Sequence, residues 1–321
     1  MTTVSVVIPN YNGEKYINGC LDALKKQSTD DFDVIIVDNG SEDDSLKKIE
    51  ECSKGLRLSI IKLDKNYGFA KAVNEGIKAS KAPFVILLNN DTCVGPHFVA
   101  ALLARIQEDK RIFSAQAHML KYDNPHITDS AGDYFSAMGW GFQRGRDKAA
   151  KKYRKPCDIF SSCGGAAIYR REIFDIIGYF DENFFAYLED VDIGFRARLY
   201  GYRNVYAPRA KVLHMGSASS GSRYNGFKVR LSARNSILVM YKNFTTGQKL
   251  MNMPLILLGI FIKTLFFWRK HLVLWYLGGV LEAFSYFGKV EKTRPIEGYE
   301  EIMGREMERE LLINVIRRLL P

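Results

Sequence analysis

Short runs of apolar, often β-branched residues alternate with stretches of helical periodicity along the N-terminal part of the chain. The expected strands are 4–8, 34–37, 58–63 and 84–88, and the expected helices are 13–27, 70–79 and a segment that is capped within 41–44 and ends at 51. Strands that alternate with helices favour a parallel sheet. We therefore predict an α/β fold with a Rossmann-like, mostly parallel sheet flanked by helices.

Polar residues follow three of these strands. They are Pro9-Asn10-Tyr11, Asp38-Asn39 and Asn89-Asn90-Asp91. Ligands of open α/β sheets bind beyond the carboxyl ends of the strands, so these residues predict a binding crevice at that edge. The first strand is not followed by a GxGxxG sequence, which argues against a dinucleotide site, and the sequence contains no P-loop.

The composition is that of a folded protein in a reducing compartment. Apolar residues make up 47% of the 321 residues, which is enough for a core in one large domain with an appendage, or in two domains. The five cysteines form no CxxC pair and no zinc pattern, so we expect reduced thiols in a cytosolic protein. The N-terminus lacks the basic region and cleavage site of a signal peptide.

The net charge of +10 is unevenly distributed. No acidic residue occurs between Asp192 and Glu282, although that stretch is rich in Lys and Arg, and the basic run 144–155 contains only Asp147 as a counter-charge. Such asymmetry predicts an anionic partner, which is a phosphate group, a nucleic acid or an anionic membrane. For the 144–155 run, a solvated basic surface is the alternative.

Residues 250–287 are strongly apolar but are interrupted by basic residues. The charge-free runs 250–262 and 271–281 are shorter than the ~20 residues that span a bilayer. Basic breaks with Trp and Tyr nearby are typical of helices that lie in the membrane interface. A packed helical subdomain or an oligomer contact is the alternative. We predict a main domain at 1–240 and a helical, amphipathic, membrane-associating extension at 241–321.

Two aspartates at the strand ends are candidate ligand-binding residues. The carboxylate of Asp38 is placed to accept hydrogen bonds from a nucleobase or ribose, and an ordinary turn aspartate is an equal alternative. Asp91 is a candidate metal ligand, because a divalent cation that bridges two phosphates needs only one or two protein carboxylates. A plain turn is the alternative for Asp91, but its place at the sheet edge favours the metal.

The segment FFAYLEDVDIGFRARLYGYR predicts a helix that carries a candidate general base. Asp192 and Arg196 are spaced for an ion pair. Glu189 and Asp190 fall in the first turn, where the helix dipole keeps a carboxylate ionised, as a base must be. Neighbouring aromatic residues would raise its pKa toward the working range. Acidic residues at helix starts are common, so a structural role is the alternative.

Two further features are ambiguous on their own. His214 follows an expected strand; a lone histidine is more often structural, but an imidazole also completes manganese or magnesium sites. Gly164, Gly165 and Ala166 would allow the backbone to approach a ligand closely, or would form an ordinary turn.

Seven ordered motifs together resemble a known family. They are SVVIPNYNG, VDNGSED, NYGFAKAVNEGI, LLNND, GGAAIYRR, FDENFFAYLEDVDIGFRARLYGYR and LHMGSAS. Over roughly residues 3–240 the chain resembles family 2 glycosyltransferases with the glycosyltransferase A-type fold, particularly bacterial rhamnosyltransferase-like members. Each motif is weak alone, whereas their order is specific.

The resemblance implies a role for each candidate residue. On the donor side, Pro9 and Tyr11 would line the base pocket, Asp38 would bind the base, and Asn66 and the segment to Asn74 would shape the diphosphate side. Asn89, Asn90 and Asp91 occupy the position of the family's Asp-x-Asp motif, so Asn89 and Asn90 would contact the donor, and Asp91 would hold the metal with His214. On the acceptor side stand Gly165, Ala166 and Glu189, with Asp190 as the base. Asn89 replaces an aspartate of many members, which lowers the charge at the metal.

The sequence therefore predicts an inverting glycosyltransferase that uses Mg²⁺ or Mn²⁺. The donor would be a nucleotide-diphosphate sugar, with rhamnose as the first candidate sugar. The acceptor would be a lipid-linked glycan or a polysaccharide in cell-envelope glycan synthesis. We expect a cytoplasmic protein at the inner face of the membrane, with no nucleic-acid partner. One alternative is a nucleotidyltransferase, although SVVIPNYNG lacks the glycine-rich, basic loop that it needs. The other is a non-catalytic membrane or nucleic-acid binding module.

Overall fold

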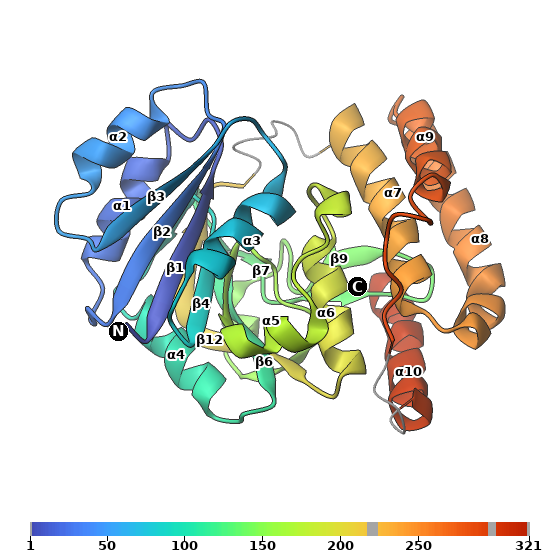
Figure 1. The fold of residues 1–321 in the computed structure, drawn as a ribbon. Coiled ribbons are helices and arrows are strands. Elements are labelled where there is room, and N and C mark those ends of the chain that lie inside the picture. Colours follow the sequence, from blue (N-terminus) through green and yellow to red (C-terminus); the bar gives the residue numbers. More distant parts are fainter. Residues whose placement is uncertain (1, 217–223, 295–299, 320–321) are drawn as a thin grey trace.

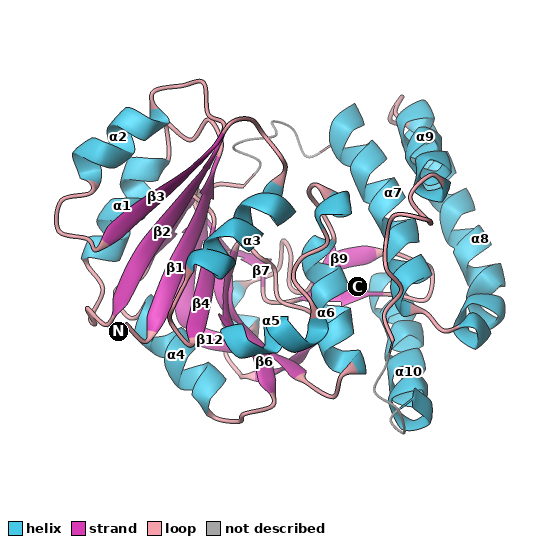
Figure 2. Ribbon diagram, viewed as in Figure 1, coloured by secondary structure: helices cyan, strands magenta, loops and turns pink. Residues whose placement is uncertain are grey.

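A ten-stranded sheet forms the centre of the protein, and helices cover both of its faces (Figures 1 and 2). The structure is a computed structural model that describes residues 2–216, 224–294 and 300–319. The strands of this sheet lie in the order β10-β12-β6-β11-β4-β1-β2-β3, with β5 paired to β12 and β7 paired to β6. Strands β8 and β9 form a separate pair.

The element bounds agree with the expected strands and refine the expected helices. The strands are β1 (Val4–Asn10), β2 (Phe32–Asn39), β3 (Leu58–Leu63), β4 (Phe84–Leu88), β5 (Thr92–Val94), β6 (Ile112–Lys121), β7 (Thr128–Ser130), β8 (Asp133–Phe135), β9 (Gly141–Gln143), β10 (Cys157–Ile159), β11 (Ala166–Arg170) and β12 (Arg203–His214). The helices are α1 (Ile17–Lys25), α2 (Ser45–Cys52), α3 (Phe69–Ala79), α4 (Phe98–Gln107), α5 (Arg171–Ile177), α6 (Glu189–Leu199), α7 (Gly226–Asn243), α8 (Thr246–Trp268), α9 (Val273–Phe284) and α10 (Glu300–Leu319), with short 3-10 turns η1 (Ala150–Lys152) and η2 (Glu182–Phe184).

The sheet is mixed, with a parallel majority. Strands β1, β2, β3, β4, β6 and β12 run in one direction. Strand β11 is antiparallel to both of its neighbours, β4 and β6, and separates them. The predicted mostly parallel sheet is confirmed, and β11 is the feature that the simple alternation of strands and helices does not reveal.

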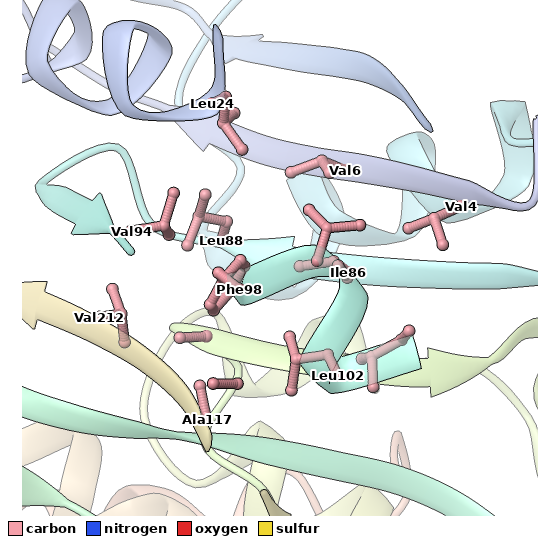
Figure 3. Close-up of a cluster of buried hydrophobic side chains, with 14 of the residues drawn as sticks. Val4, Val6, Leu24, Ile86, Leu88, Val94, Phe98, Leu102, Ala117 and Val212 are labelled. Atoms are coloured by element: carbon pink, nitrogen blue, oxygen red, sulfur yellow. The ribbon is translucent and has the colours of Figure 1, made fainter. Parts of the chain in front are cut away.

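Alternating side chains of the strands build two cores. On one face, Val4, Val6, Ile86 and Leu88 pack against α1 and α4, and Figure 3 shows these residues together with Leu24, Phe98 and Leu102. On the other face, Val7, Ile35 and Leu87 pack against α3, α5 and α6. Residues one apart in a strand point to opposite faces, so a strand that is covered on both sides must be apolar throughout.

The expected helix at 13–27 begins later, at Ile17. A Cβ atom at Gly13 would lie 2.2 Å from both Asn10 Oδ1 and Asn90 Nδ2, so the backbone at Gly13 lies directly against two polar side chains at the sheet edge. Residues 14–16 form a turn, closed by hydrogen bonds from the backbone N–H groups of Tyr16 and Ile17 to the Gly13 carbonyl. The chain therefore completes this polar turn before it starts the helix.

Helices α7–α10 form a group beside the sheet (Figure 1) and share a core with α6. This core contains Val191 and Phe195 of α6, Leu238 of α7, Ala283 of α9 and Leu311 of α10. Asp192 of α6 forms the expected ion pair with Arg196 at 3.0 Å, and a second ion pair with Lys242 of α7 at 3.2 Å. The predicted boundary at 240/241 falls within α7, and the division into two domains stays a prediction.

Helix α8 is long and apolar enough to cross a membrane by the criteria of length and composition, and little of it is buried. The charge-free run 250–262 ends before Lys263, whereas the helix continues through Lys263 to Trp268. A single helix of this kind is weak support for a membrane span. An interfacial position for the C-terminal helices therefore stays a prediction.

Candidate active site

The ends of β1, β2 and β4 are joined by a buried chain of polar side chains. Asn10 donates from Nδ2 to Asp38 Oδ1 at 2.9 Å, and Asn90 donates from Nδ2 to Asn10 Oδ1 at 2.8 Å. The backbone N–H of Ser41 donates to the other carboxylate oxygen of Asp38 at 3.2 Å. Asn10 therefore links the expected base-binding residue, Asp38, to the Asn89-Asn90-Asp91 segment. The position of Asn10 at a strand end did not predict this linking role.

The other donor-side candidates lie at the same edge. Pro9 pairs with Val37 at the end of β1, and Tyr11 follows β1; both are half-buried. Asn66 accepts at Oδ1 from Asn39 Nδ2 at 3.0 Å and from the Gly68 backbone N–H at 2.9 Å. Asn66 thus fixes the turn before α3 to the end of β2. The roles of these residues in donor binding stay predictions.

Asp91 and His214 meet because β5 pairs with β12. This pairing sets His214 opposite Thr92, and the backbone N–H of Met215 donates to the Asp91 carbonyl at 3.1 Å. The side-chain atoms His214 Nε2 and Asp91 Oδ1 lie 3.4 Å apart. His214 Nδ1 is 2.8 Å from Asp129 Oδ2, so two carboxylates flank the imidazole.

This donor set fits the expected metal. Carboxylate oxygen and imidazole nitrogen both suit Mn²⁺, and carboxylate oxygen suits Mg²⁺. A second carboxylate that holds the far nitrogen of a ligating histidine is common around bound metals. Asp129 was not predicted, because no local pattern in its sequence, ITDSAG, relates it to His214. Asp91 and His214 are the residues that would hold the ion.

His214 is also a charged group in the absence of a metal. Burial disfavours its protonated form, but the hydrogen bonds and charges of Asp129 and Asp91 outweigh burial and raise the pKa of His214 to about 9. A metal ion binds the neutral imidazole, so it must displace this proton. The site is therefore stabilised by a proton when no metal is bound.

Gly165 and Ala166 lie beside the first residue of the Asn89-Asn90-Asp91 segment. The backbone N–H of Asn89 donates to the Gly165 carbonyl at 2.9 Å, and Ala166 pairs with Leu88. A Cβ atom at Gly165 would lie 3.0 Å from Asn89 Nδ2 and 3.3 Å from a methyl carbon of Met119. A side chain at position 165 would therefore require Asn89 and Met119 to shift by a few tenths of an ångström. The role of Gly165 toward an acceptor stays a prediction.

Asp190 lies in the first turn of α6, as expected, and points to the Gly164-Gly165 turn. Its Oδ2 accepts from the Gly164 N–H at 3.2 Å, and its Oδ1 accepts from the Val191 N–H at 2.8 Å. Burial raises the pKa of Asp190, while these two N–H groups oppose the rise. The half-buried Asp190 is an oriented carboxylate with a pKa moved toward neutral pH, as a general base requires.

Glu189 has a different environment. It is buried, and its Oε2 atom has no hydrogen-bond partner among the described residues. Burial, followed by the charge of Asp190, raises the pKa of Glu189 well above its usual value. Its predicted contact with the acceptor is untested.

Asp133 of β8 is a close neighbour of Asp190 that the sequence analysis missed. Ligand atoms of Asp133, Cys163 and Asp190 all lie within 4.8 Å of one another. Burial, followed by the charge of Asp190, raises the pKa of Asp133 well above its usual value, and burial does the same for the Cys163 thiol. Metals need deprotonated ligands, so this trio fits a metal less well than Asp91 and His214 do.

Four predicted site residues thus converge on the end of β4, namely Asp38, Asp91, Asp190 and His214. Asp38 reaches Asn90 through Asn10, and His214 contacts Asp91. Asp190 accepts from Gly164, whose neighbour Gly165 is bonded to Asn89. Arg223, a basic residue of the segment GSASSGSRYNG, lies outside the described residues.

Comparison with known proteins identifies the family. The sequence model described as "Glycosyl transferase family 2" matches residues 5–178, which is more than half of the chain. The chain belongs to glycosyl transferase family 2. The resemblance stated from the motifs is confirmed.

Two relatives of this chain are a rhamnosyltransferase and a teichoic acid polymerase. The chain is 27% identical over 241 residues to N-acetylglucosaminyl-diphospho-decaprenol L-rhamnosyltransferase of Mycobacterium tuberculosis. This match covers 67% of this chain and 77% of the relative. The chain is 31% identical over 131 residues to teichoic acid poly(glycerol phosphate) polymerase of Staphylococcus epidermidis, which covers 40% of this chain but only 18% of the polymerase.

A solved structure confirms the fold. The structure of GalNAc-T7 with UDP, GalNAc and Mn²⁺ matches with a TM-score of 0.61 at 19% identity, and covers 75% of this chain and 48% of that protein. At this identity the match supports the fold alone. The protein is a glycosyltransferase of family 2 with the glycosyltransferase A-type fold.

The protonated His214 predicts a pH-dependent stability of the metal-free protein. The pKa of His214 is raised from 6.5 to about 9, so its contribution is fully present below pH 6.5 and is lost as the pH rises through 9. Urea denaturation in EDTA should show that the free energy of unfolding loses roughly 3 kcal/mol over this range. His214→Gln should remove most of this dependence. Equal pH slopes in both proteins would show that His214 is not the titrating group.

Proposed function

We propose that this glycosyltransferase is metal-dependent and inverting, and that it moves a sugar from a nucleotide-diphosphate donor to a hydroxyl group of a lipid-linked or polysaccharide acceptor. One observation carries the proposal. A candidate metal-binding pair, Asp91 and His214, and a candidate base, Asp190, flank the same strand end. This is the arrangement that a direct displacement at a sugar carbon requires.

In the proposed reaction, Asp190 accepts the proton of the acceptor hydroxyl as that oxygen attacks the anomeric carbon. The N–H groups of Gly164 and Val191 orient its carboxylate. Bound Mg²⁺ or Mn²⁺ would supply Lewis-acid stabilisation of the departing diphosphate. Burial and the charge of Asp190 raise the pKa of Asp133 well above its usual value, which favours its protonated, non-nucleophilic form. A single base without a second nucleophile supports inversion of configuration.

We propose a rhamnose donor as the first candidate, because the Mycobacterium tuberculosis relative is a rhamnosyltransferase that acts on a lipid-linked sugar. Uridine diphosphate hexoses are the second candidate. In this proposal Asp38, held by Asn10 and by the Ser41 N–H, presents its carboxylate to the base of the nucleotide. Pro9, Tyr11 and Asn66 would complete the donor side.

We further propose that the C-terminal helices bind the cytoplasmic face of the cell membrane. The exposed large apolar residues of α8 and α9 are Leu250, Met251, Met253, Leu257, Leu258, Phe261, Leu265, Phe266, Trp268, Leu274, Trp275, Leu281 and Phe284. Exposed Arg269, Lys270 and His271 lie in the turn between these helices. An apolar surface with adjacent basic residues favours an anionic lipid surface, where a lipid-linked acceptor would be found.

Replacing the proposed base tests the chemistry. A thermal-shift panel of nucleotide sugars with Mn²⁺ first identifies the donor. Asp190→Asn should then lower kcat by about 10²–10⁴-fold, because proton transfer from the acceptor is lost, while donor stabilisation stays nearly unchanged. Asp175→Asn, an exposed carboxylate of α5, is the matched control and should keep full activity. Release of nucleoside diphosphate at the wild-type rate by Asp190→Asn would refute the assignment.

A charge on the apolar face tests the membrane proposal. Phe261→Glu, on the exposed face of α8, should reduce sedimentation with anionic vesicles several-fold, because a carboxylate resists transfer into the interface. Ile176→Glu adds the same charge at an exposed apolar residue of α5, and should bind vesicles like the wild type. If both variants bind as the wild type does, the α8 face is not the membrane contact.

A further inference from the structure

Residues 184–188, immediately before the proposed base, have an unusual backbone. Phe185, Tyr187 and Leu188 have φ angles of 62°, 72° and 67°. Residues with a side chain rarely adopt positive φ, and such conformations persist only where the surrounding structure holds them. Asp190 follows Leu188 by two residues, so whatever holds this segment also sets the position of the base.

Two buried side chains of α7 hold this segment. The Nδ2 atom of Asn235 lies 3.0 Å from the carbonyl oxygen of Phe184, 2.9 Å from that of Ala186 and 2.7 Å from that of Tyr187. Arg234 donates from Nη2 to the Asn183 carbonyl at 3.0 Å and to the Phe184 carbonyl at 2.9 Å. Four backbone carbonyl groups of this segment therefore face α7, those of Asn183, Phe184, Ala186 and Tyr187.

The orientation of Asn235 is itself fixed by Arg234. The Nε atom of Arg234 donates to Asn235 Oδ1 at 2.9 Å, so the amide nitrogen must face the segment. The Nη1 atom of Arg234 donates to Glu282 Oε1 at 3.2 Å and to the Tyr286 hydroxyl at 3.2 Å. With the two bonds from Nη2, these contacts give a partner to each of the five N–H groups of the guanidinium. Burying this charge is costly without such partners.

Glu282 and Tyr286 belong to the C-terminal part of the chain, in and just after α9. The guanidinium of Arg234 also lies over the Tyr286 ring, 4.6 Å from its centre. A continuous set of contacts therefore runs from α9 through Arg234 and Asn235 to the backbone that precedes Asp190. Apolar packing alone would dock α7 on α6, and does not require a buried arginine and asparagine at this point.

The held segment also contacts the donor side of the site. The Phe185 carbonyl accepts from the Ala70 N–H at 3.3 Å, and a Cβ atom at Gly68 would lie 2.4 Å from that carbonyl oxygen. Gly68 belongs to the turn that Asn66 fixes. Residues 184–188 thus precede Asp190 in the chain and contact the start of α3 on the donor side.

We propose that Arg234 and Asn235 are positioning residues for Asp190, and that Glu282 and Tyr286 make the C-terminal helices part of the active site. This proposal rests on the proposed function for the role of Asp190. It does not depend on whether the same helices bind a membrane. A helical extension that served only as an anchor would be separable from catalysis, whereas this one is not.

The test uses the full chain and two variants of different severity. Asn235→Leu removes the amide at similar side-chain volume, and Glu282→Ala removes a partner of Arg234 at a partly exposed site. Arg230→Ala is the matched control: Arg230 binds the same Glu282 at 2.6 Å, but is half exposed and contacts none of residues 184–188 in the interactions described. Each variant is assayed for kcat, for KM of the donor, and for hydrogen exchange of the peptides that cover 181–190.

We expect Asn235→Leu to lower kcat by about 10²-fold and Glu282→Ala by about 10-fold, with the donor KM within threefold of the wild-type value. The reason is that a displacement of a catalytic group by about 1 Å can slow the reaction by about 10²-fold. Both should speed exchange in 181–190, and Arg230→Ala should change neither quantity. Unchanged exchange in both variants would overturn the proposal whatever the activity. Faster exchange with an unchanged kcat would also overturn it. If the wild type transfers no sugar, the proposed function fails, and the exchange result still decides whether the pair holds the segment.

Should Asn235→Leu fail to fold, Glu282→Ala and Tyr286→Phe replace it. Tyr286→Phe removes only the hydroxyl that accepts from Arg234 Nη1, and keeps the ring beneath the guanidinium. It should lower kcat and speed exchange of 181–190 in the same direction, but by less than Glu282→Ala. Wild-type behaviour of both variants would contradict a positioning role.

Discussion

The pairing of parallel strands β1, β2 and β4 is the constraint on which the candidate site depends. Because these strands run in one direction, their carboxyl ends lie together, and the side chains of Asn10, Asp38 and Asn90 bond to one another there. Buried polar side chains need hydrogen-bond partners, and these three side chains supply them to one another. The polar edge of the sheet is therefore held in place by its own hydrogen bonds, and in the proposed function it is the donor-binding surface.

Two strands that come later in the chain, β11 and β12, complete this edge of the sheet. Strand β12 brings His214 to Asp91 through its pairing with β5, and β11 brings the Gly164-Gly165 turn to Asn89. Helix α6 then presents Asp190 to Gly164. The C-terminal helices share a core with α6 and bond to the backbone before Asp190. In this account, the extension acts on the site through α6 and the segment that precedes it.

The sequence predicted those features that depend on neighbouring residues. Strands 58–63 and 84–88 were placed correctly because their apolar runs are local, and the Asp192–Arg196 pair was placed correctly because four residues are one helical turn. Motif order identified the family. The expected helix start at residue 13 was wrong, because Gly13 lies against Asn10 and Asn90, and residue 90 is remote in sequence.

The missed residues are those whose partners are distant. Asp129 contacts His214 across 85 positions, and Asp133 meets Asp190 through the packing of β8 near α6. Asn235 is an ordinary polar residue in a helical sequence, until its three carbonyl partners are known. No periodicity reports such contacts. Asn89 stands where many members of the family carry aspartate. The structure places a second carboxylate, that of Asp129, beside His214 in addition to Asp91.

The most direct test is a crystal structure of the protein with Mn²⁺ and the nucleoside diphosphate of its donor, with the anomalous signal of manganese recorded. We expect one strong anomalous peak, from a manganese ion bound by Asp91 and His214, with the nucleobase beside Asp38 and the Asp190 carboxylate open to the same cleft. A manganese peak at Asp133, Cys163 and Asp190, or a nucleotide bound away from the end of β4, would contradict this expectation.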